Sequence, residues 1–171
     1  MATTSPHPPQ GNGLGNPAIL LATWFGSGLL PFMPGTWGSL AALPFAWVLH
    51  MSFAWTWLAL AILAVFVIGL WAASGYLARL GGDDPAPVVI DEVAGQWLTL
   101  LPAAYLAPLA PDPLTYLVGF VLFRVADIFK PWPASWADKQ IHGGLGIMLD
   151  DILAAVYSGL GLSLFIIYWV N

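Results

Sequence analysis

Apolar side chains dominate the chain in five stretches, at roughly residues 37–50, 53–79, 88–108, 114–129 and 146–170. None of them alternates strictly as a membrane β-barrel strand does, and a backbone in lipid has to satisfy its hydrogen bonds internally, so we predict a helix for each.

A crossing of the membrane takes about 20 apolar residues, with about 17 as a lower limit. The second and fifth stretches meet this length. The first is short and contains Pro44, Pro102 interrupts the third, and the fourth lies near the limit. The pattern predicts an all-α, polytopic integral membrane helical bundle with about five spans.

Residues 17–36 precede these stretches and are apolar but irregular. Glycine and proline recur through PAILLATWFGSGLLPFMPGT, which makes it too broken for a separate span and too apolar for a solvated loop. Non-helical backbone at membrane depth is tolerated where protein or a wet cavity covers it, so we expect a re-entrant or interfacial segment. Residues 1–16 are rich in proline and glycine and lack a basic signal-peptide start. We expect a flexible tail there, followed by a single domain at 17–171.

The composition agrees with a lipid environment. Of 171 residues, 59% are hydrophobic and 8% are charged, whereas ordinary soluble domains have about 25% charged residues. Nine acids stand against four bases, for a net charge of −5, which argues against nucleic acid as a partner because that would require basic patches. An acidic excess in an apolar chain instead suggests bound cations. The absence of cysteine excludes disulfides, thiolate metal sites and cysteine nucleophiles.

Alternation of five spans gathers the charged residues on one face of the membrane. That face receives the starts of the first, third and fifth spans and the ends of the second and fourth, and only Asp112 falls opposite. All four bases share it, so the positive-inside rule makes it cytoplasmic, with the N-terminus inside and the C-terminus outside. The residues assigned to this face are Arg79, Asp83, Asp84, Asp91, Glu92, Arg124, Asp127, Lys130, Asp138, Lys139, Asp150 and Asp151.

Carboxylates lie near the ends of three predicted spans. Asp91 and Glu92 are near the start of the third, Asp127 is near the end of the fourth, and Asp150 and Asp151 are near the start of the fifth. Each pair alone is explained by acids that complement a helix dipole. Five carboxylates on one face are better explained by a hard cation, Mg²⁺ first and Mn²⁺ or Ca²⁺ behind it, because these ions prefer oxygen ligands. We predict that these five acids form a metal site.

We expect the two acids of the fifth span to play different roles, because adjacent helical residues project about 100° apart. Asp151 shares a stripe of mostly smaller side chains with Ile147, Ala154 and Ser158. A more apolar stripe, suited to lipid, contains Leu145, Leu149, Ile152 and Val156. We therefore predict that Asp151 faces inward and that Asp150 lies between the two stripes.

Candidate phosphate-binding cations follow in the segment FRVADIFKPWP. Arg124 would bind a phosphate through its planar fork and Lys130 as a point charge. Two alternatives stay open, since Arg124 can pair with Asp127 three residues later and Lys130 can extend to the membrane interface. Pro131 and Pro133 are expected to end this helix and to prevent its resumption.

Three further polar residues are candidates for the same chemistry. His142 precedes a glycine-rich turn whose backbone N–H groups can approach an anion, which makes it a catalytic candidate, although a lone loop histidine is more often a structural group. Thr36 and Ser39 offer hydroxyls to a phosphate, or cap the helix that begins beside them. The sequence has no cysteine, no D-x-D pair at a strand end and no second nearby histidine, and each of these belongs to another phosphatase mechanism. A metal-activated water is the phosphatase chemistry that remains.

Three motifs in order carry a family resemblance: FGSGLLPFMPGTWGSLAALP, VIDEVAGQW and FRVADIFKPWPASWADKQIHGGLGIMLDDILAA. Over roughly residues 18–160 the chain resembles phosphatidylglycerophosphatase A. The resemblance implies a Mg²⁺-dependent, multi-pass lipid phosphatase of the bacterial inner membrane with its site at the cytoplasmic face. It also implies the substrate, phosphatidylglycerophosphate, whose terminal phosphate is hydrolysed to give phosphatidylglycerol in phospholipid biosynthesis.

A cation-coupled membrane carrier is the alternative class, because intramembrane carboxylates and broken segments also mark ion paths. A carrier would place its ionisable groups near mid-span and show repeated halves, and the sequence has neither pattern. We therefore favour the enzyme. The residues leave open the general base, the number of metal ions, the acyl-chain preference and the oligomeric state.

Overall fold

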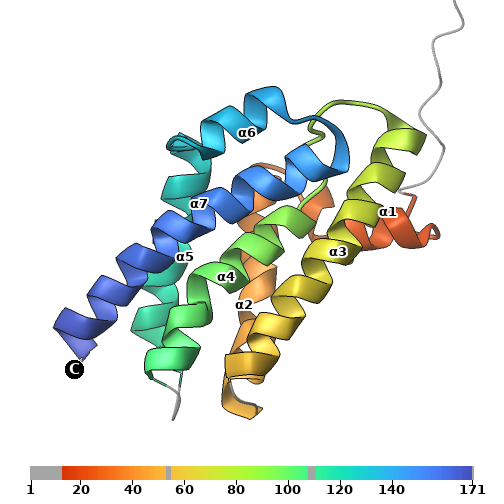
Figure 1. The fold of residues 1–171 in the computed structure, drawn as a ribbon. Coiled ribbons are helices and arrows are strands. Elements are labelled where there is room, and N and C mark those ends of the chain that lie inside the picture. Colours follow the sequence, from red (N-terminus) through yellow and green to blue (C-terminus); the bar gives the residue numbers. More distant parts are fainter. Residues whose placement is uncertain (1–12, 53–54, 108–110, 171) are drawn as a thin grey trace, which may run out of the picture.

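The computed structural model describes residues 13–52, 55–107 and 111–170, and within these ranges the chain is helical with no strand (Figure 1). The all-α prediction is therefore confirmed for the described residues. A short 3₁₀ turn covers Ser27–Leu29, and a π-helical turn at Ile166–Val170 extends the last helix. The α-helices are α1 (Pro17–Ala22), α2 (Pro34–Ser52), α3 (Trp55–Leu80), α4 (Ile90–Leu106), α5 (Pro113–Phe129), α6 (Ala134–Gln140) and α7 (Gly143–Phe165).

The five predicted apolar stretches correspond to α2, α3, α4, α5 and α7. Two helices of the described chain are long and apolar enough to cross a membrane, namely α3 and the stretch Gly143–Trp169. By contrast, α4 and α5 have 17 residues each, and α2 has 19 with Pro44 inside it. Crossing by these three helices stays a prediction.

The segment before α2 is as irregular as its glycines and prolines indicate. The Asn16 side chain accepts hydrogen bonds from the backbone of Ala18 and Ile19 and so starts α1, but α1 ends after six residues. Two turns follow in which non-glycine residues have positive φ, at Trp24 and Phe25 and again at Phe32 and Met33. Residues 1–12 of the predicted tail lie outside the described residues.

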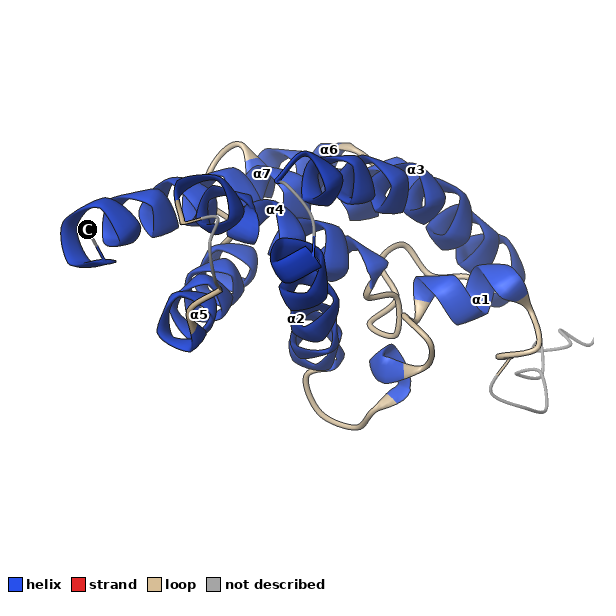
Figure 2. Cartoon of the chain, turned by 90° about the horizontal axis from the view of Figure 1, so that it is seen from below, coloured by secondary structure: helices blue, strands red, loops and turns tan. Residues whose placement is uncertain are grey.

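Helix α4 forms the centre of the bundle. It packs against α2, α3, α5 and α7, and in Figure 2 α2 and α5 lie on one side of the layer formed by α3, α4 and α7. A Cβ at Gly95 of α4 would lie 2.5 Å from the Phe123 ring and 3.2 Å from the Asp151 carbonyl oxygen. The missing side chain thus lets α4 approach α5 and α7 closely. The Trp97 indole donates a 2.9 Å hydrogen bond to the Ala42 carbonyl of α2.

One short helix was not expected from the sequence. We predicted that Pro133 prevents a helix from resuming, and this was wrong, because α6 begins at the next residue. The amides of Ala134 and Ala137 donate to the carbonyls of Pro131 and Pro133. The first amides of a helix have no partner within it, so a proline at its start sacrifices no hydrogen bond.

The long helices run in alternating directions. Figure 1 shows the C-terminal ends of α3 and α5 and the N-terminal ends of α4 and α7 towards the upper end of the molecule, where α6 also lies. This order agrees with the predicted alternation and brings the charged helix ends together.

Candidate active site at the charged end of the bundle

A cavity of about 240 Å³ lies where these helix ends meet. It is lined by parts of the segment before α4 and by the ends of α2, α4, α5 and α7, which are far apart in the sequence. All five predicted metal-binding acids and both predicted phosphate-binding cations line it. The polar lining residues are Asp84, Asp91, Glu92, Arg124, Asp127, Lys130, Asp150 and Asp151.

Three of the acids form a cluster. Asp91 and Glu92 from the first turn of α4 and Asp151 from α7 each offer an oxygen, and these atoms lie within 4.8 Å of one another. We call these three residues the acid triad. One oxygen of each, Asp91 Oδ1, Glu92 Oε2 and Asp151 Oδ2, is buried without a hydrogen-bond partner. Buried, unpaired carboxylates are costly, and a hard divalent cation with oxygen preference fits this set.

The backbone of α2 lies against the triad. A Cβ at Gly35 would be 2.0 Å from Glu92 Oε1 and 3.1 Å from Arg124 Nη1. Any larger residue there would push the Glu92 carboxylate away, so the glycine of the PGT sequence lets Glu92 keep its position in the triad.

Arg124 joins α2, α4 and α5 at the wall of the cavity. Its Nη1 lies 2.5 Å from Asp127 Oδ2 and 3.9 Å from Glu92 Oε1, and it donates a 3.3 Å hydrogen bond to Ser39 Oγ. The pairing of Arg124 with Asp127, which the sequence left open, is therefore present. It coexists with a position in the cavity wall, so it does not exclude phosphate binding.

Lys130 turns towards the site rather than away from it. It ends α5 in the left-handed conformation, with φ 43°. Its Nζ lies 2.5 Å from Asp138 Oδ1 on α6 and 2.5 Å from Asp150 Oδ2 on α7. Burial by itself lowers the pKa of Lys130, but the hydrogen bonds to Asp138 and Asp150 outweigh it and raise the pKa above its usual value. The ammonium is therefore charged at neutral pH.

The two adjacent acids of α7 are both buried but face different partners. Asp151 is 3% exposed and belongs to the acid triad. The other residues of its predicted stripe, Ile147, Ala154 and Ser158, are buried as well. Leu145 and Val156 of the opposite stripe are about half exposed. Asp150 is buried too, but it contacts Lys130.

The remaining predicted residues do not line the cavity. Ser39 is fully buried, donates to the Gly35 carbonyl and accepts from Arg124, so it lies behind the arginine. Thr36 Oγ1 is buried without a partner. His142 is exposed at the N-cap of α7, where it lines a small neighbouring cavity together with Asp83, Asp84, Asp138 and Asp150.

The structure adds residues that the sequence did not single out. Asp138 binds Lys130, and Asp84 lines both cavities. Gln96 is completely buried, and neither atom of its amide has a partner. Its spacing could have identified Gln96 from the sequence, because it lies four residues after Glu92 on the same face of α4.

Comparison with known proteins gives a consistent family. The family profile described as phosphatidylglycerophosphatase A matches residues 20–166. A phosphatidylglycerophosphatase A of Escherichia coli strain K12 is 43% identical over 145 residues, which is 85% of this chain and 81% of that protein. The enzyme of the same name from Haemophilus influenzae is 38% identical over 144 residues, 84% of this chain and 85% of that protein.

A third relative has a different name. A protein of Bacteroides thetaiotaomicron named "Putative phosphatidylinositol-3-phosphatase" is 40% identical over 154 residues, covering 82% of this chain and 87% of that protein. No solved structure matches the chain. The profile match over nearly the whole helical region, together with relatives aligned over most of their own length, shows that the chain belongs to the phosphatidylglycerophosphatase A family of phosphatases.

Proposed function

We propose that the protein is a Mg²⁺-dependent lipid phosphatase that hydrolyses the terminal phosphate of phosphatidylglycerophosphate to give phosphatidylglycerol. The observation that carries this proposal is the acid triad, with its unpaired buried oxygens, in one cavity with Arg124 and Lys130. The triad suits a divalent cation, and the two cations suit a phosphate. The names of the relatives from Escherichia coli and Haemophilus influenzae supply the substrate.

In this proposal Asp91, Glu92 and Asp151 hold Mg²⁺, which when bound polarises a phosphoryl oxygen and lowers the pKa of water. Arg124 and Lys130 bind the phosphomonoester and neutralise the charge that grows on it during hydrolysis. Asp127 and Asp150 orient these two cations through the ion pairs described above.

Residues outside the cavity act indirectly or at its margin. Ser39 holds Arg124 in place by accepting its hydrogen bond. Thr36 lies one residue after Gly35 at the start of α2, and His142 lies beside the second cavity, which shares Asp84 and Asp150 with the first. Because of these positions beside the two cavities, we assign Thr36 to substrate binding and His142 to proton transfer.

The surroundings in this proposal are the bacterial inner membrane. All five long helices cross the bilayer, and the cavity lies at the cytoplasmic face. Large apolar side chains that are at least half exposed in the described chain support contact with lipid along three of these helices, among them Val67 of α3, Val121 of α5 and Leu160 of α7.

The direct test is phosphate release by the purified protein in detergent. Turnover of phosphatidylglycerophosphate is expected with Mg²⁺, to stop with excess chelator, and to return when Mg²⁺ is restored. Undiminished turnover in chelator would contradict the metal site.

Phosphatidylinositol 3-phosphate is the second candidate substrate, because the relative from Bacteroides thetaiotaomicron carries the corresponding name. It belongs in the same assay. A higher kcat/KM for that lipid than for phosphatidylglycerophosphate would make it the substrate.

The topology is tested by single cysteines, since the chain has none of its own. Asp112→Cys and Gln140→Cys replace exposed residues before α5 and at the end of α6. With an impermeant maleimide, we expect residue 112 to react in intact cells and residue 140 only after the inner membrane is opened. Reaction of both from the same side would refute the alternation of five crossings. Loss of the Asp112 cap costs about 1 kcal/mol, which a helix bundle tolerates.

A further inference from the structure

The polar cavity has an apolar rim on one side. Met33, before α2, and Ile128, near the end of α5, both line the cavity, yet they are 61% and 58% exposed. Their neighbours Phe32 and Phe129 are among the most exposed aromatic residues, at 88% and 79%. We call these four residues the rim. An acid-lined cavity bordered by bare apolar side chains is unusual for a site that takes a water-soluble substrate.

The backbone holds the rim in this position at a cost. Phe32 and Met33 have φ of 60° and 51°, in the left-handed region that suits glycine, and Lys130, directly after Phe129, has φ 43°. Such a conformation is unfavourable for a non-glycine residue, and residues that adopt it cluster at functional sites. Neither turn recovers this cost by burying its aromatic side chain within the described chain. A surrounding apolar phase would stabilise both.

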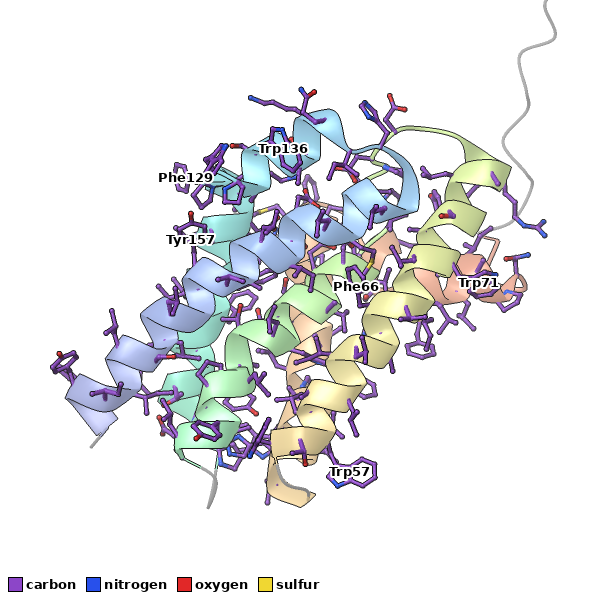
Figure 3. All side chains as sticks on the ribbon, viewed as in Figure 1. Trp57, Phe66, Trp71, Phe129, Trp136 and Tyr157 are labelled. Atoms are coloured by element: carbon purple, nitrogen blue, oxygen red, sulfur yellow. The ribbon has the colours of Figure 1, made fainter. Side chains whose placement is uncertain are left out.

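Aromatic residues beside the rim indicate the level of the membrane at this end of the bundle. Trp132 and Trp136 are 74% and 51% exposed, and Tyr157 donates a hydrogen bond to the Trp132 carbonyl. Figure 3 shows Phe129, Trp136 and Tyr157 towards the same outer edge, near the junction of α5 and α6. Tryptophan and tyrosine concentrate at the headgroup level of membranes. In a bilayer the rim would therefore lie where lipid headgroups meet acyl chains.

Two other apolar grooves do not serve the same purpose. One lies between α4 and α7 and includes Leu101 and Leu160, and the other lies between α2 and α3 and includes Phe45 and Ala61. Neither groove shares a lining residue with the polar cavity. The rim is continuous with it, because Met33 and Ile128 line the cavity themselves.

We propose that the rim is a lateral opening for the lipid substrate. The phosphorylated headgroup passes between Met33 and Ile128 towards Arg124 and Lys130, while the glycerol esters and acyl chains stay against Phe32 and Phe129 in the bilayer. This inference rests on the proposed function, because it needs a lipid phosphomonoester as substrate. It adds the direction from which that lipid enters and the residues that distinguish it from a soluble phosphate.

The kinetic test compares two substrates that share one headgroup. The double variant Phe32→Ser/Phe129→Ser is assayed with diacyl phosphatidylglycerophosphate in mixed micelles and with its deacylated, water-soluble headgroup. We expect kcat/KM for the diacyl lipid to fall roughly tenfold or more, because two apolar contacts are lost, and kcat/KM for the deacylated compound to stay unchanged. Trp71→Ser, which removes an exposed aromatic residue of α3 outside the cavity lining, is the matched control and should leave both values unchanged. An equal fall for both substrates, or no fall for the diacyl lipid, would overturn the proposal.

A second measurement does not depend on activity. A fluorophore is attached to Phe32→Cys, Phe129→Cys or, as a control, Lys139→Cys, and the protein is placed in vesicles whose acyl chains carry a spin label. We expect strong quenching at positions 32 and 129 and little at the exposed lysine position. Absence of quenching at both rim positions would overturn the proposal even in an active enzyme. Quenching in a protein that hydrolyses neither lipid would instead show that the proposed function has failed while the rim contacts lipid.

Discussion

Asp151→Asn is expected to lower phosphate release about a thousandfold at saturating Mg²⁺, because a direct ligand that is lost removes several kcal/mol of charge stabilisation. Asp150→Asn is expected to lose only about 10–100-fold, as is usual for a residue that acts through a ligand or a cation. The geometry gives the reason for the difference. Asp151 belongs to the acid triad and has an unpaired buried oxygen, whereas Asp150 contacts the Lys130 ammonium.

Both variants keep the shape of the side chain, so they should insert in the membrane and purify as the parent does. Binding of Mn²⁺, followed by its electron paramagnetic resonance signal, gives a readout independent of turnover. It should weaken strongly in Asp151→Asn and slightly in Asp150→Asn. A larger loss in Asp150→Asn would show that the helix face is assigned wrongly, and near-parental rates in both would refute a metal role for the pair.

The helices and the grouping of the acids were predictable because both depend on local sequence. Apolar stretches near membrane-spanning length define the long helices without any tertiary information, and the alternation of antiparallel helices then brings Asp91, Arg124 and Asp151 to one end. The helical period alone predicted that Asp151 faces inward, and Asp151 is buried. Asp150 is buried as well, so the two acids differ in their neighbours and not in their exposure.

The contacts of Lys130 were not predictable, because they depend on how α6 folds back over α7. Asp138 lies within the third motif, but the sequence suggested no role for it, and the helix that holds it begins directly after Pro133, where we expected none. Gly35 was noticed only as part of a glycine-rich stretch. Its role depends on the distance between α2 and α4, which the local pattern does not encode.

The carrier alternative receives no support from the arrangement of charges. The acidic residues of the described chain that line a cavity gather at one end of the bundle, around the two small cavities there. His50 lies buried in the second half of α2, but its ring nitrogens contact the Tyr116 hydroxyl and the Ala107 carbonyl. These contacts give the histidine a structural role, and the family of the chain consists of phosphatases.

Lys130→Met is expected to lower kcat/KM for the phosphorylated lipid by about 100- to 1,000-fold, the usual effect of removing one donor that stabilises developing charge. The side chain of methionine preserves most of the apolar stem and removes the ammonium, which leaves Asp138 and Asp150 facing each other without a counter-charge. Their repulsion should further disfavour an incoming phosphate. Lys130→Arg keeps the charge and should recover part of the loss.

Lys139→Met is the matched control, because Lys139 is an exposed lysine of α6 at the same end of the bundle and does not line the cavity. It removes the same charge from the protein as a whole, so any effect of net charge on binding of an anionic lipid appears in both variants. We expect Lys139→Met to stay within about twofold of the parent, since a solvated charge is screened over about 10 Å.

The decisive quantity is the ratio of kcat/KM for Lys139→Met to kcat/KM for Lys130→Met on the same lipid. A ratio near one would mean that Lys130 acts only through the general charge of this face, and the ion pairs with Asp138 and Asp150 would then be structural. A ratio of about 100 or more that is partly recovered in Lys130→Arg places the ammonium at the phosphate, because only a local contact depends on which lysine is removed.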